Sequence, residues 1–557
     1  MLRKVLLAAL ALIVIGGIAA WFNRNAIMAA LMMRQIEATK QDVAPYREVE
    51  WNEGPATADV PASERPPNII IILFDDFGYN DLSTFGGGVA GGRVPTPNID
   101  RLAARGAIFD QAYSGTGTCA PSRAMLMTGR YPTRTGFEFT PMPDGMARAL
   151  PILAGDTDRG ALPSAIFNPD LDEEALPFRD QGLPGSEITL AELLKQNGYH
   201  TVHIGKWHLG ERADFKANAQ GFDESLNMHN GLYLREDDPN VVNARLDWDP
   251  FDKFLWARMQ FAATFNGGKP FEPGGYLTDW WTDQSLKVIE ANRNRPFFLY
   301  LAHWGVHTPL QATRADYDAV GDIRPHHLRV YAAMVRALDR SVGRIMAKLE
   351  AEGLADNTIV ILSSDNGGAG YVGLPQINAP YRGWKITLFE GGIRVPMFVH
   401  WPQRIKPGTR IDTPVAHIDV FPTLADAAGV PLPTDRIIDG RSMLPLATGT
   451  GGLERPDNAI FWQSGEYQVV RAGNWKLQVD GLQNRLWLFD LASDPTERTD
   501  LAASMPDKVA ELRQLLASHR KGAVKSLYPF KLASPILIDK TADQKAVEGD
   551  EFVIWPN

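Results

Sequence analysis

The sequence contains a single cysteine, Cys119, among its 557 residues. An intrachain disulfide is therefore excluded, although an exported protein would be free to form one. A lone cysteine is most often a small buried apolar residue, so Cys119 has either a packing role or a chemical one. The choice between the two depends on the residues that surround it.

An excess of positive charge is also lacking. The 56 Lys and Arg residues are outnumbered by 66 Asp and Glu residues, which gives a formal net charge of -10. Because a nucleic-acid-binding protein normally presents a basic face, the composition argues against nucleic acid as a partner. The hydrophobic content of 45% and charged content of 22% are those of a globular protein with a large buried core.

Only one long hydrophobic run is present, near the N-terminus. Arg3 and Lys4 precede an apolar stretch, residues 5–22, that only two glycines interrupt. Its length lies between that of a cleavable signal peptide and that of a membrane span, which needs about 20 apolar residues. Residues 1–25 are therefore predicted to be a signal anchor or a signal peptide. We favour an anchor, with the folded part outside the cytoplasm, periplasmic in a bacterium; cleavage would give a secreted protein.

The rest of the chain predicts an α/β fold. Residues 26–67 are predicted to be a linker, because their second half is rich in Pro, Ala and acidic residues. Over residues 68–450, short β-type runs alternate with polar clusters and helical stretches, which predicts a large, mostly parallel sheet flanked by helices. Residues 451–557 are predicted to form a smaller α+β subdomain, an antiparallel sheet plus a helix.

Four predicted strands end in polar clusters. Open α/β sheets bind ligands beyond the carboxyl ends of their strands, so we expect these clusters to meet at one edge. They are NIIIILF (68–74) followed by Asp75 and Asp76, HTVHI (200–204) followed by Lys206 and His208, PFFLYL (296–301) followed by His303 and His307, and TIVIL (358–362) followed by Asp365 and Asn366.

The acidic residues among them suggest a metal site. Adjacent carboxylates such as Asp75 and Asp76 repel each other unless a cation or a proton separates them, and Asp365 with Asn366 supplies the same ligand type. Hard oxygen donors without a histidine pair favour calcium over zinc, and an all-protein cage favours calcium over magnesium. Either pair alone is equally well explained by a turn or a helix N-cap, whereas both pairs at strand ends favour a metal.

Cys119 opens the segment CAPSR, which AMLMTGR follows. Pro121 suits the first turn of a helix and the next residues favour helix, so Cys119 is predicted to lie at the positive end of a helix dipole. An anion would bind there. A plain thiolate at this point would be a possible nucleophile.

The segment closely resembles the sulfatase signature C-x-P-S-R. The chain thus resembles the sulfatase family, formylglycine-dependent and arylsulfatase-like, of the alkaline phosphatase superfamily, and residues 68–450 would be its catalytic domain. The resemblance covers roughly residues 68 to 505, where similar segments follow in the family's order: FDDFGYNDLSTFGG, PTPNIDRLAARGAIFDQAYS, TGRYPTRTG, GKWHLG, SSDNGG, WKITLFEGGIRVPMFVHWP, HIDVFPTLADAAGV and LWLFDLASDPTERTDLA.

This resemblance implies that a formylglycine-generating enzyme oxidises Cys119 to formylglycine (3-oxoalanine). One hydroxyl of the aldehyde hydrate attacks sulfur and expels the alcohol, and the other then loses its proton so that sulfate leaves. A thiolate would instead form a sulfur-bound sulfate with no easy exit. The implied activity is hydrolysis of small-molecule or saccharide sulfate monoesters to alcohol and inorganic sulfate.

The family's residue roles carry over to matching positions. One calcium ion would be held by Asp75, Asp76, Asp365 and Asn366 together with residue 119. Arg123 matches the signature arginine. Lys206 and His208, in GKWHLG, match the lysine that contacts the sulfate and hydrate and the histidine that handles the hydrate's proton. His307 and Lys385 match the pair that grips the sulfate and protonates the leaving oxygen, so Lys206, His307 and Lys385 would bind substrate.

Two alternatives remain at this point. A formylglycine-dependent hydrolase of phosphate or phosphonate esters would use similar donors, but a singly charged sulfate ester suits one calcium, whereas two-zinc phosphatases need further histidine ligands. A binding protein on a decayed scaffold is disfavoured because every matched catalytic position is present. Aryl, steroid and sugar sulfates all stay open, and aromatic side chains in an insertion, among them Trp248, Trp256, Trp280 and Trp281, would stack on a ring or simply pack.

Overall fold

The computed structural model describes residues 6, 21, 24–154, 159–167 and 176–557. The segment predicted as a signal anchor or signal peptide, residues 1–25, therefore lies almost wholly outside the described residues. Within the described ranges, no helix is both long enough and apolar enough for a bilayer crossing.

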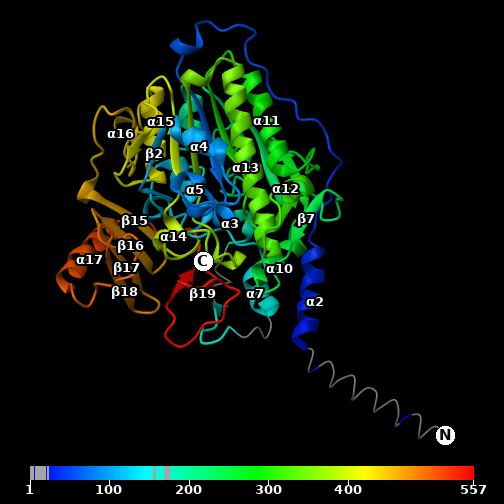
Figure 1. Ribbon diagram of the computed structural model, residues 1–557, viewed down its shortest axis with the longest axis vertical. Coiled ribbons are helices and arrows are strands. Elements are labelled where there is room, and N and C mark those ends of the chain that lie inside the picture. Colours follow the sequence, from blue (N-terminus) through cyan, green and yellow to red (C-terminus); the bar gives the residue numbers. More distant parts are fainter. Residues whose placement is uncertain (1–5, 7–20, 22–23, 155–158, 168–175) are drawn as a thin grey trace.

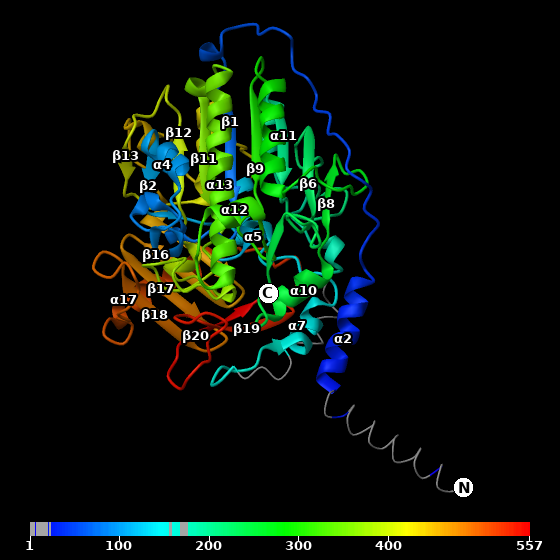
Figure 2. The same ribbon diagram turned by 45° about the vertical axis from the view of Figure 1, so that its right-hand side comes forward.

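Nine strands of the described chain form the central sheet (Figure 2). Their order is β13 (Thr409–Ile411), β2 (Ala107–Phe109), β12 (Met397–His400), β11 (Thr358–Ser364), β1 (Asn68–Phe74), β9 (Phe297–Ala302), β5 (His200–Gly205), β6 (Glu224–Gly231) and β8 (Phe261–Phe265). The five strands from β11 to β6 pair in parallel, while β12 and β8 run antiparallel to their neighbours. The predicted, mostly parallel sheet is confirmed.

Helices cover both faces of this sheet, and strand β1 shows why. Its residues are all buried, as the continuous apolar run of a doubly covered parallel strand requires. Ile70 and Ile72 pack toward α4 (Pro97–Ala104), α11 (Leu277–Ala291) and α13 (His326–Ala351), whereas Ile69 and Ile71 pack toward α5 (Cys119–Thr128), α9 (Leu190–Gln196) and α15 (Val420–Ala428). The alternation of side chains along one strand thus joins two hydrophobic cores.

The C-terminal part contains the predicted antiparallel sheet. Its strands are β15 (Ala459–Ser464), β16 (Tyr467–Ala472), β17 (Trp475–Asp480) and β18 (Arg485–Asp490), and helix α17 (Pro506–Arg520) packs on it (Figure 1). A further small sheet joins β19 (Leu532–Leu537) to β20 (Phe552–Pro556) and β4 (Ile166–Phe167). The C-terminal segment therefore pairs with the insertion that contains β4.

The other elements are short connections and insertions around these layers. They are α2 (Arg24–Glu37), α3 (Val89–Gly92), α6 (Pro132–Thr135), α7 (Met146–Ala154), α10 (Pro250–Arg258), α12 (Arg314–Ala319), α14 (Glu390–Ile393), α16 (Leu444–Thr448), β3 (Ala112–Tyr113), β7 (Val241–Ala244), β10 (Leu310–Thr313) and β14 (Val415–Ala416).

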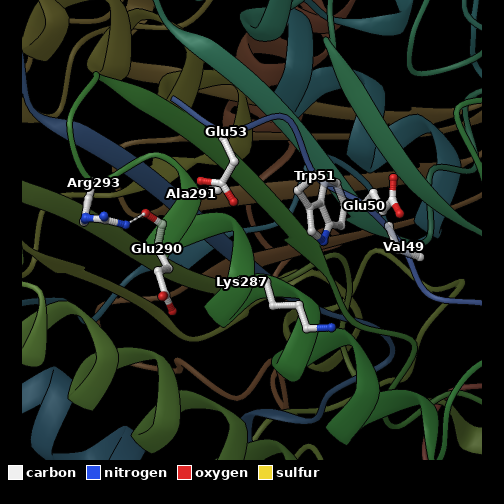
Figure 3. A pocket seen from close by; sticks show the side chains of 8 residues that line it. All are labelled: Val49, Glu50, Trp51, Glu53, Lys287, Glu290, Ala291 and Arg293. Atoms are coloured by element: carbon white, nitrogen blue, oxygen red, sulfur yellow. Dashed lines mark hydrogen bonds between the residues drawn. The ribbon is translucent and has the colours of Figure 1, made fainter. Parts of the chain in front are cut away.

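The stretch predicted as a linker, residues 26–67, includes most of helix α2 and then lies against the folded part. Ala44 forms a bridge with Phe271, and the Trp51 indole donates a 2.9 Å hydrogen bond to Gln284 of α11. An open hollow of about 460 Å³ lies between residues 49–53 and α11 (Figure 3). Both acidic and basic side chains line this hollow.

The domain boundaries given from the sequence stay predictions.

A buried ion pair joins the C-terminal sheet to the segment that contains α14. The Lys476 ammonium, on β17, lies 2.9 Å from carboxylates of both Glu390 and Glu497, and all three side chains are inaccessible to solvent. The Glu497 carboxylate also accepts a 2.6 Å hydrogen bond from the backbone N–H of Glu390. One cation therefore compensates two carboxylates at the junction.

We expect Lys476→Met to lower the free energy of unfolding by about 3–5 kcal/mol, because it leaves the buried Glu497 carboxylate without its cation and leaves Glu390 with Arg394, 3.2 Å away. Chemical denaturation of the purified chain measures this loss. Lys508→Met, which removes a partly exposed pair with Glu511, is the matched control and should change stability by less than about 1 kcal/mol. Equal stability of the two variants would contradict the role assigned to Lys476.

Candidate active site

The polar clusters meet at one edge of the sheet, as predicted. Strands β11, β1, β9 and β5 are consecutive neighbours, so the residues that follow them lie side by side. Asp75 and Asp76 follow β1, Lys206 follows β5, and His307 lies beyond β9. His303 does not join them; it is buried in the core, where its ring nitrogen lies 3.0 Å from the Ser341 hydroxyl.

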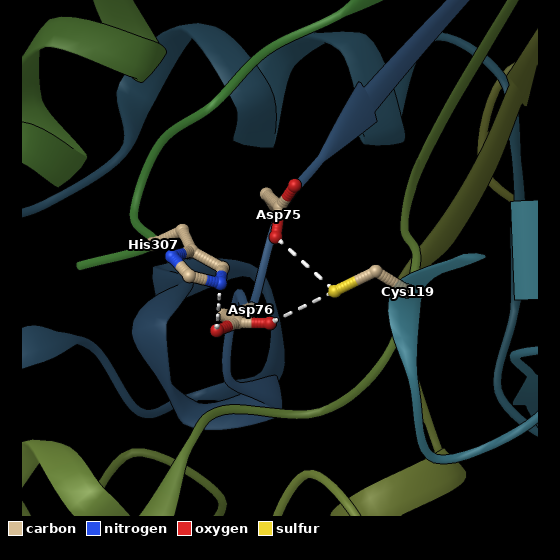
Figure 4. Close-up of side chains that lie close together, drawn as sticks. All are labelled: Asp75, Asp76, Cys119 and His307. Atoms are coloured by element: carbon tan, nitrogen blue, oxygen red, sulfur yellow. Dashed lines mark hydrogen bonds and ion pairs between the residues drawn. The ribbon is translucent and has the colours of Figure 1, made fainter. Parts of the chain in front are cut away.

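Four side chains converge at the centre of this edge (Figure 4). The Cys119 sulfur lies 3.5 Å from a carboxylate oxygen of Asp75 and 3.7 Å from one of Asp76, and His307 Nε2 lies 3.6 Å from the other Asp76 oxygen. One ligand atom from each of these residues fits within 4.8 Å of all the others, and all four residues are buried. The predicted cysteine and the predicted carboxylates thus share one small site.

Cys119 is the first residue of helix α5, as the sequence indicates. The segment before it approaches other backbone closely: a Cβ on Gly117 would lie 2.7 Å from the Thr387 carbonyl oxygen, so glycine is required there. Burial raises the pKa of the Cys119 thiol well above its usual range, and the carboxylates of Asp365 and Asp75 add to this shift. The side chain is therefore a thiol here, not a ready thiolate.

Arg123 lies one turn further along α5 and is completely buried. Its guanidinium donates to Asp75 at 2.8 Å, to Asp365 at 2.8–2.9 Å and to the Lys206 carbonyl at 2.8 Å. The planar fork of an arginine suits such a bridge between two carboxylates. Arg123 therefore holds Asp75 and Asp365 in place.

Two lysines bring positive charge to the same carboxylates. Lys206 Nζ lies 2.6 Å from Asp75, and Lys385 Nζ lies 2.7 Å from Asp76. Burial opposes ionisation of Asp76, but the charge of the nearby Lys385 ammonium lowers its pKa. Burial raises the pKa of Asp75 to about 7, with the Asp365 charge adding to the shift. The two adjacent carboxyl groups thus lie in different electrostatic environments.

The two predicted catalytic histidines, His208 and His307, are both held in place by their surroundings. His307 stacks on Trp304 with ring centroids 3.9 Å apart, and its Nδ1 lies 2.6 Å from the Thr308 carbonyl, which assigns the proton to Nδ1 and leaves Nε2 facing the site. His208 has a left-handed backbone (φ 63°), and its buried Nδ1 has no partner among the described residues. Burial lowers the pKa of both histidines well below the usual value.

The acidic donors fit a hard cation. Asn366 donates through its amide nitrogen to Asp76 at 2.9 Å, while its buried Oδ1 finds no hydrogen-bond partner within the described ranges. An unpartnered buried acceptor is costly unless a cation satisfies it. Asp365 accepts a 3.3 Å hydrogen bond from the Asp76 backbone N–H as well as those from Arg123. The chemistry of the donor set is thus that of an oxygen-ligated divalent ion.

One residue of the site was missed in the sequence. The Tyr371 hydroxyl lies 2.8 Å from an Asp76 oxygen and 3.2 Å from Lys385 Nζ. No motif marks this tyrosine; the only available signal was its place in the loop after β11, a few residues beyond Asn366.

The aromatic insertion largely serves packing. Trp280 and Trp281 lie on α11 in the hydrophobic core, and Trp256 is buried on α10. Trp248 is different, because its indole N–H donates a 3.0 Å hydrogen bond to the carbonyl of Tyr371. Only this tryptophan of the four therefore supports a residue of the site.

Comparison with known families agrees with this geometry. The sulfatase family model matches residues 67–430, which is more than half of the chain. This chain belongs to the sulfatase family. A second model, described as N-sulphoglucosamine sulphohydrolase, C-terminal, matches residues 383–522 of the sulfatase. The protein is accordingly an enzyme that hydrolyses sulfate esters.

Curated relatives extend over most of the sulfatase chain. N-acetylgalactosamine-6-sulfatase of Mus musculus is 34% identical over 420 residues, which cover 74% of this chain and 72% of the mouse protein. Steryl-sulfatase of Mus musculus is 31% identical over 484 residues, with 74% and 70% of the two chains covered. The chain is thus similar both to a sulfatase named for a sugar sulfate and to one named for steryl sulfates.

Solved structures share the fold. Ps i-CgsB in complex with k-i-k-neocarrahexaose is 30% identical, with a TM-score of 0.68 over 83% of this chain and 95% of that one. The phosphonate monoester hydrolase SpPMH from Silicibacter pomeroyi is 18% identical with a TM-score of 0.56, over 83% and 96% of the chains. At that identity the second likeness shows the fold alone.

We expect Arg123→Lys to lower the free energy of unfolding by about 2–4 kcal/mol, because a single ammonium cannot replace charged hydrogen bonds to two carboxylates and a carbonyl. Thermal and chemical denaturation measure this loss. The control Arg105→Lys alters an exposed pair with Glu350 and should leave stability within about 0.5 kcal/mol of wild type. A fully stable Arg123→Lys variant would show that the bridge is dispensable.

Proposed function

We propose that the sulfatase hydrolyses sulfate monoesters with a formylglycine made from Cys119 and with one calcium ion. The observation that carries the proposal is the position of the only cysteine, buried at the N-terminus of α5 beside Asp75 and Asp76. Its thiol is held protonated, so the unmodified residue is a poor nucleophile. The aldehyde hydrate would supply two hydroxyls, one to attack sulfur and one whose deprotonation releases sulfate.

Asp75, Asp76, Asp365 and Asn366 would hold the calcium, with residue 119 beside them. The ion would polarise a sulfate oxygen and neutralise charge in the transition state. Arg123 makes no contact that would reach a substrate, because it is buried behind Asp75 and Asp365. We therefore assign Arg123 a positioning role.

Lys206 and Lys385 would bind the sulfate group. Both ammonium groups lie within 3 Å of the paired aspartates, on opposite members of the pair, so an anion placed between them would meet positive charge from two directions. The N-terminus of α5 adds partial positive charge from its free backbone N–H groups. These groups would bind the sulfate ester in the ground state and would also stabilise the negative charge that develops in the transition state.

His208 and His307 would move protons. Both rings are neutral in their buried surroundings, and His307 presents an unprotonated Nε2 to the site, so each ring offers a nitrogen that could accept a proton in the transition state, while the Lys385 ammonium would be the proton donor. We assign His208 to the hydroxyl at residue 119, and His307 together with Lys385 to the oxygen of the leaving alcohol. This division follows from the family motifs and agrees with the placement of His307 beside Asp76.

Sulfated saccharides are the proposed substrate class. Relatives and structural neighbours include proteins named for N-acetylgalactosamine 6-sulfate and one solved with a neocarrahexaose, which supports a sugar more than a sterol. The alternative, a phosphate or phosphonate ester hydrolase, draws support only from a likeness at the level of the fold. We also propose that a formylglycine-generating enzyme modifies Cys119. Residues 1–25 would direct export and anchor the protein in a membrane. Both proposals rest on the sequence.

We expect Cys119→Ala and Cys119→Ser to abolish turnover, because alanine has no group to oxidise and an unoxidised serine lacks the second hydroxyl whose deprotonation releases sulfate. Their melting temperatures should stay close to that of wild type, because the substituted side chains are small. Activity is measured on 4-nitrophenyl sulfate and N-acetylgalactosamine 6-sulfate, and mass spectrometry of the peptide with residue 119 should find the aldehyde in active enzyme. An unmodified thiol in fully active protein would refute the proposal.

Removal of divalent ions by a chelator should abolish activity and lower the melting temperature, and added calcium should restore both. Asn366→Leu has a similar volume but no oxygen ligand, so its melting temperature should respond less to calcium than that of wild type. Asn357→Leu serves as a control, since Asn357 is buried at the opposite end of β11. A melting temperature that calcium leaves unchanged in wild type would count against the site.

A further inference from the structure

Helix α2 is held on the folded part by one of its faces. The side chains of this face pack with α7 and α10 in a shared hydrophobic cluster; they are Ala29, Met32, Met33 and Ile36. Their spacing of three and four residues is that of one side of a helix. Both ribbon views show α2 at the outer margin of the molecule, with α7 and α10 on its inner side (Figures 1 and 2). The opposite side of α2 therefore points away from the protein.

The side of α2 that points away from the protein is apolar. It carries Ile27, Met28 and Leu31, whose exposed fractions are 43%, 52% and 59%, and we call these three residues the outward face. Single exposed apolar residues are normal on a protein surface, but here three large ones share about one and a half turns of a helix. Their removal from water would be favourable.

The apolar character of this side ends after Leu31. Arg34, Gln35 and Glu37, in the last part of α2, are exposed polar residues. The outward face therefore occupies the end of α2 that is nearest to the N-terminus. Arg24 and Arg34 border it, and long basic side chains can cover apolar surface while their charges reach anionic phosphate groups.

The chain just before α2 indicates what covers the outward face. Residues 5–22 are the apolar run of the proposed membrane anchor. Arg24, where α2 begins, follows Phe22 by two residues, which span at most about 7 Å. Trp21 is 66% exposed, and the Arg24 guanidinium lies 4.5 Å from the centre of its ring. Tryptophan is enriched at the interface between a bilayer and water, so the outward face lies close to the expected membrane surface.

A second copy of the chain is a poorer occupant for this face. A stable interface between two proteins takes about 800 Å² and roughly 20–30 residues from each partner. The outward face offers three large apolar residues, with exposed charges beside them. A bilayer needs no matching surface, and a helix with apolar residues on one side and basic residues next to them lies in its headgroup region.

We propose that the outward face of α2 lies in the headgroup region of a lipid bilayer, where Ile27, Met28 and Leu31 reach the acyl chains. Helix α2 packs on α10, and the ring of Phe251 on α10 lies 6.3 Å from that of His307. This contact would therefore hold the reaction centre next to the membrane surface. The inference rests on the proposed anchoring by residues 1–25, to which it adds a second contact that orients the folded part, and it is independent of the proposed chemistry.

The test uses the full chain with Cys119→Ala, in which an introduced cysteine is the only thiol. A fluorophore is attached to Met28→Cys or Leu31→Cys, and each protein is placed in lipid nanodiscs at one chain per disc. Lipids that carry a nitroxide near the headgroup end of an acyl chain should lower the fluorescence about threefold, because the label lies among those chains. One chain per disc removes contacts between copies.

Two other labelled positions are the controls. Lys40→Cys lies just beyond the C-terminal end of α2, and Ile437→Cys replaces an isoleucine that is 57% exposed. Ile437 belongs to the segment before α16, which lies at the opposite margin of the molecule from α2 (Figure 1). The nitroxide lipid should change the fluorescence of both by less than about 1.2-fold, because neither label would reach the acyl chains.

The outcomes are distinct. Quenching at residues 28 and 31 that is no greater than at the controls would overturn the contact, and a chain that still enters the discs would leave the proposed anchor intact. Labels that respond to the number of chains per disc and not to the nitroxide would show a second copy on this face, which also overturns the contact. A chain that does not enter the discs would contradict the anchor itself. Hydrolysis of 4-nitrophenyl sulfate by the chain with Cys119 tests the proposed chemistry separately.

Discussion

Asp75 and Asp365 place negative charge in a region without solvent, and Arg123 bridges the two carboxylates there. Buried carboxylates are tolerated only when cations and hydrogen bonds compensate them. The guanidinium donates hydrogen bonds to both carboxylates. Its third hydrogen bond, to the Lys206 carbonyl, also fixes the segment that follows β5. Helix α5 therefore positions the acidic residues with the same turn that presents Cys119.

The positions of the predicted site residues follow from a general property of parallel sheets. The apolar run of β1 ends directly before Asp75, so the end of this strand is visible in the sequence, and in β11 two serines separate the apolar run from Asp365. Neighbouring parallel strands end at the same edge, which brings these clusters together without any knowledge of side-chain geometry. The motifs around Cys119 and Lys206 then give the chemistry.

Other features depend on contacts between distant segments and could not be predicted in this way. Tyr371 reaches Asp76 only because Trp248 and the C-terminal segment hold its loop. Trp281 looks the same as Trp248 in the sequence, yet it lies on α11 in the core. Periodicity describes a residue's own element, whereas these roles depend on which element packs against it.

The predicted linker shows a similar limit. Its composition is typical of a flexible linker, but composition does not predict tertiary contacts such as the hydrogen bond from Trp51 to Gln284. Helix α2 within it packs against α7 and α10, and Phe251 of α10 lies near His307. The segment that leads into the enzyme is therefore in contact with an element that borders the site.

The contacts of Lys476 also make the loop that carries Lys385 depend on a later part of the sequence. Glu390 lies five residues beyond Lys385. Its carboxylate pairs with Lys476, and its backbone N–H donates a hydrogen bond to Glu497. The hydroxyl of Tyr467, on β16, accepts a hydrogen bond from the backbone N–H of Leu388. The loop that carries Lys385 is thus braced by Tyr467, Lys476 and Glu497, which come much later in the sequence. A premature stop codon there would remove the support of the reaction centre, although every signature motif up to Lys385 would still be translated.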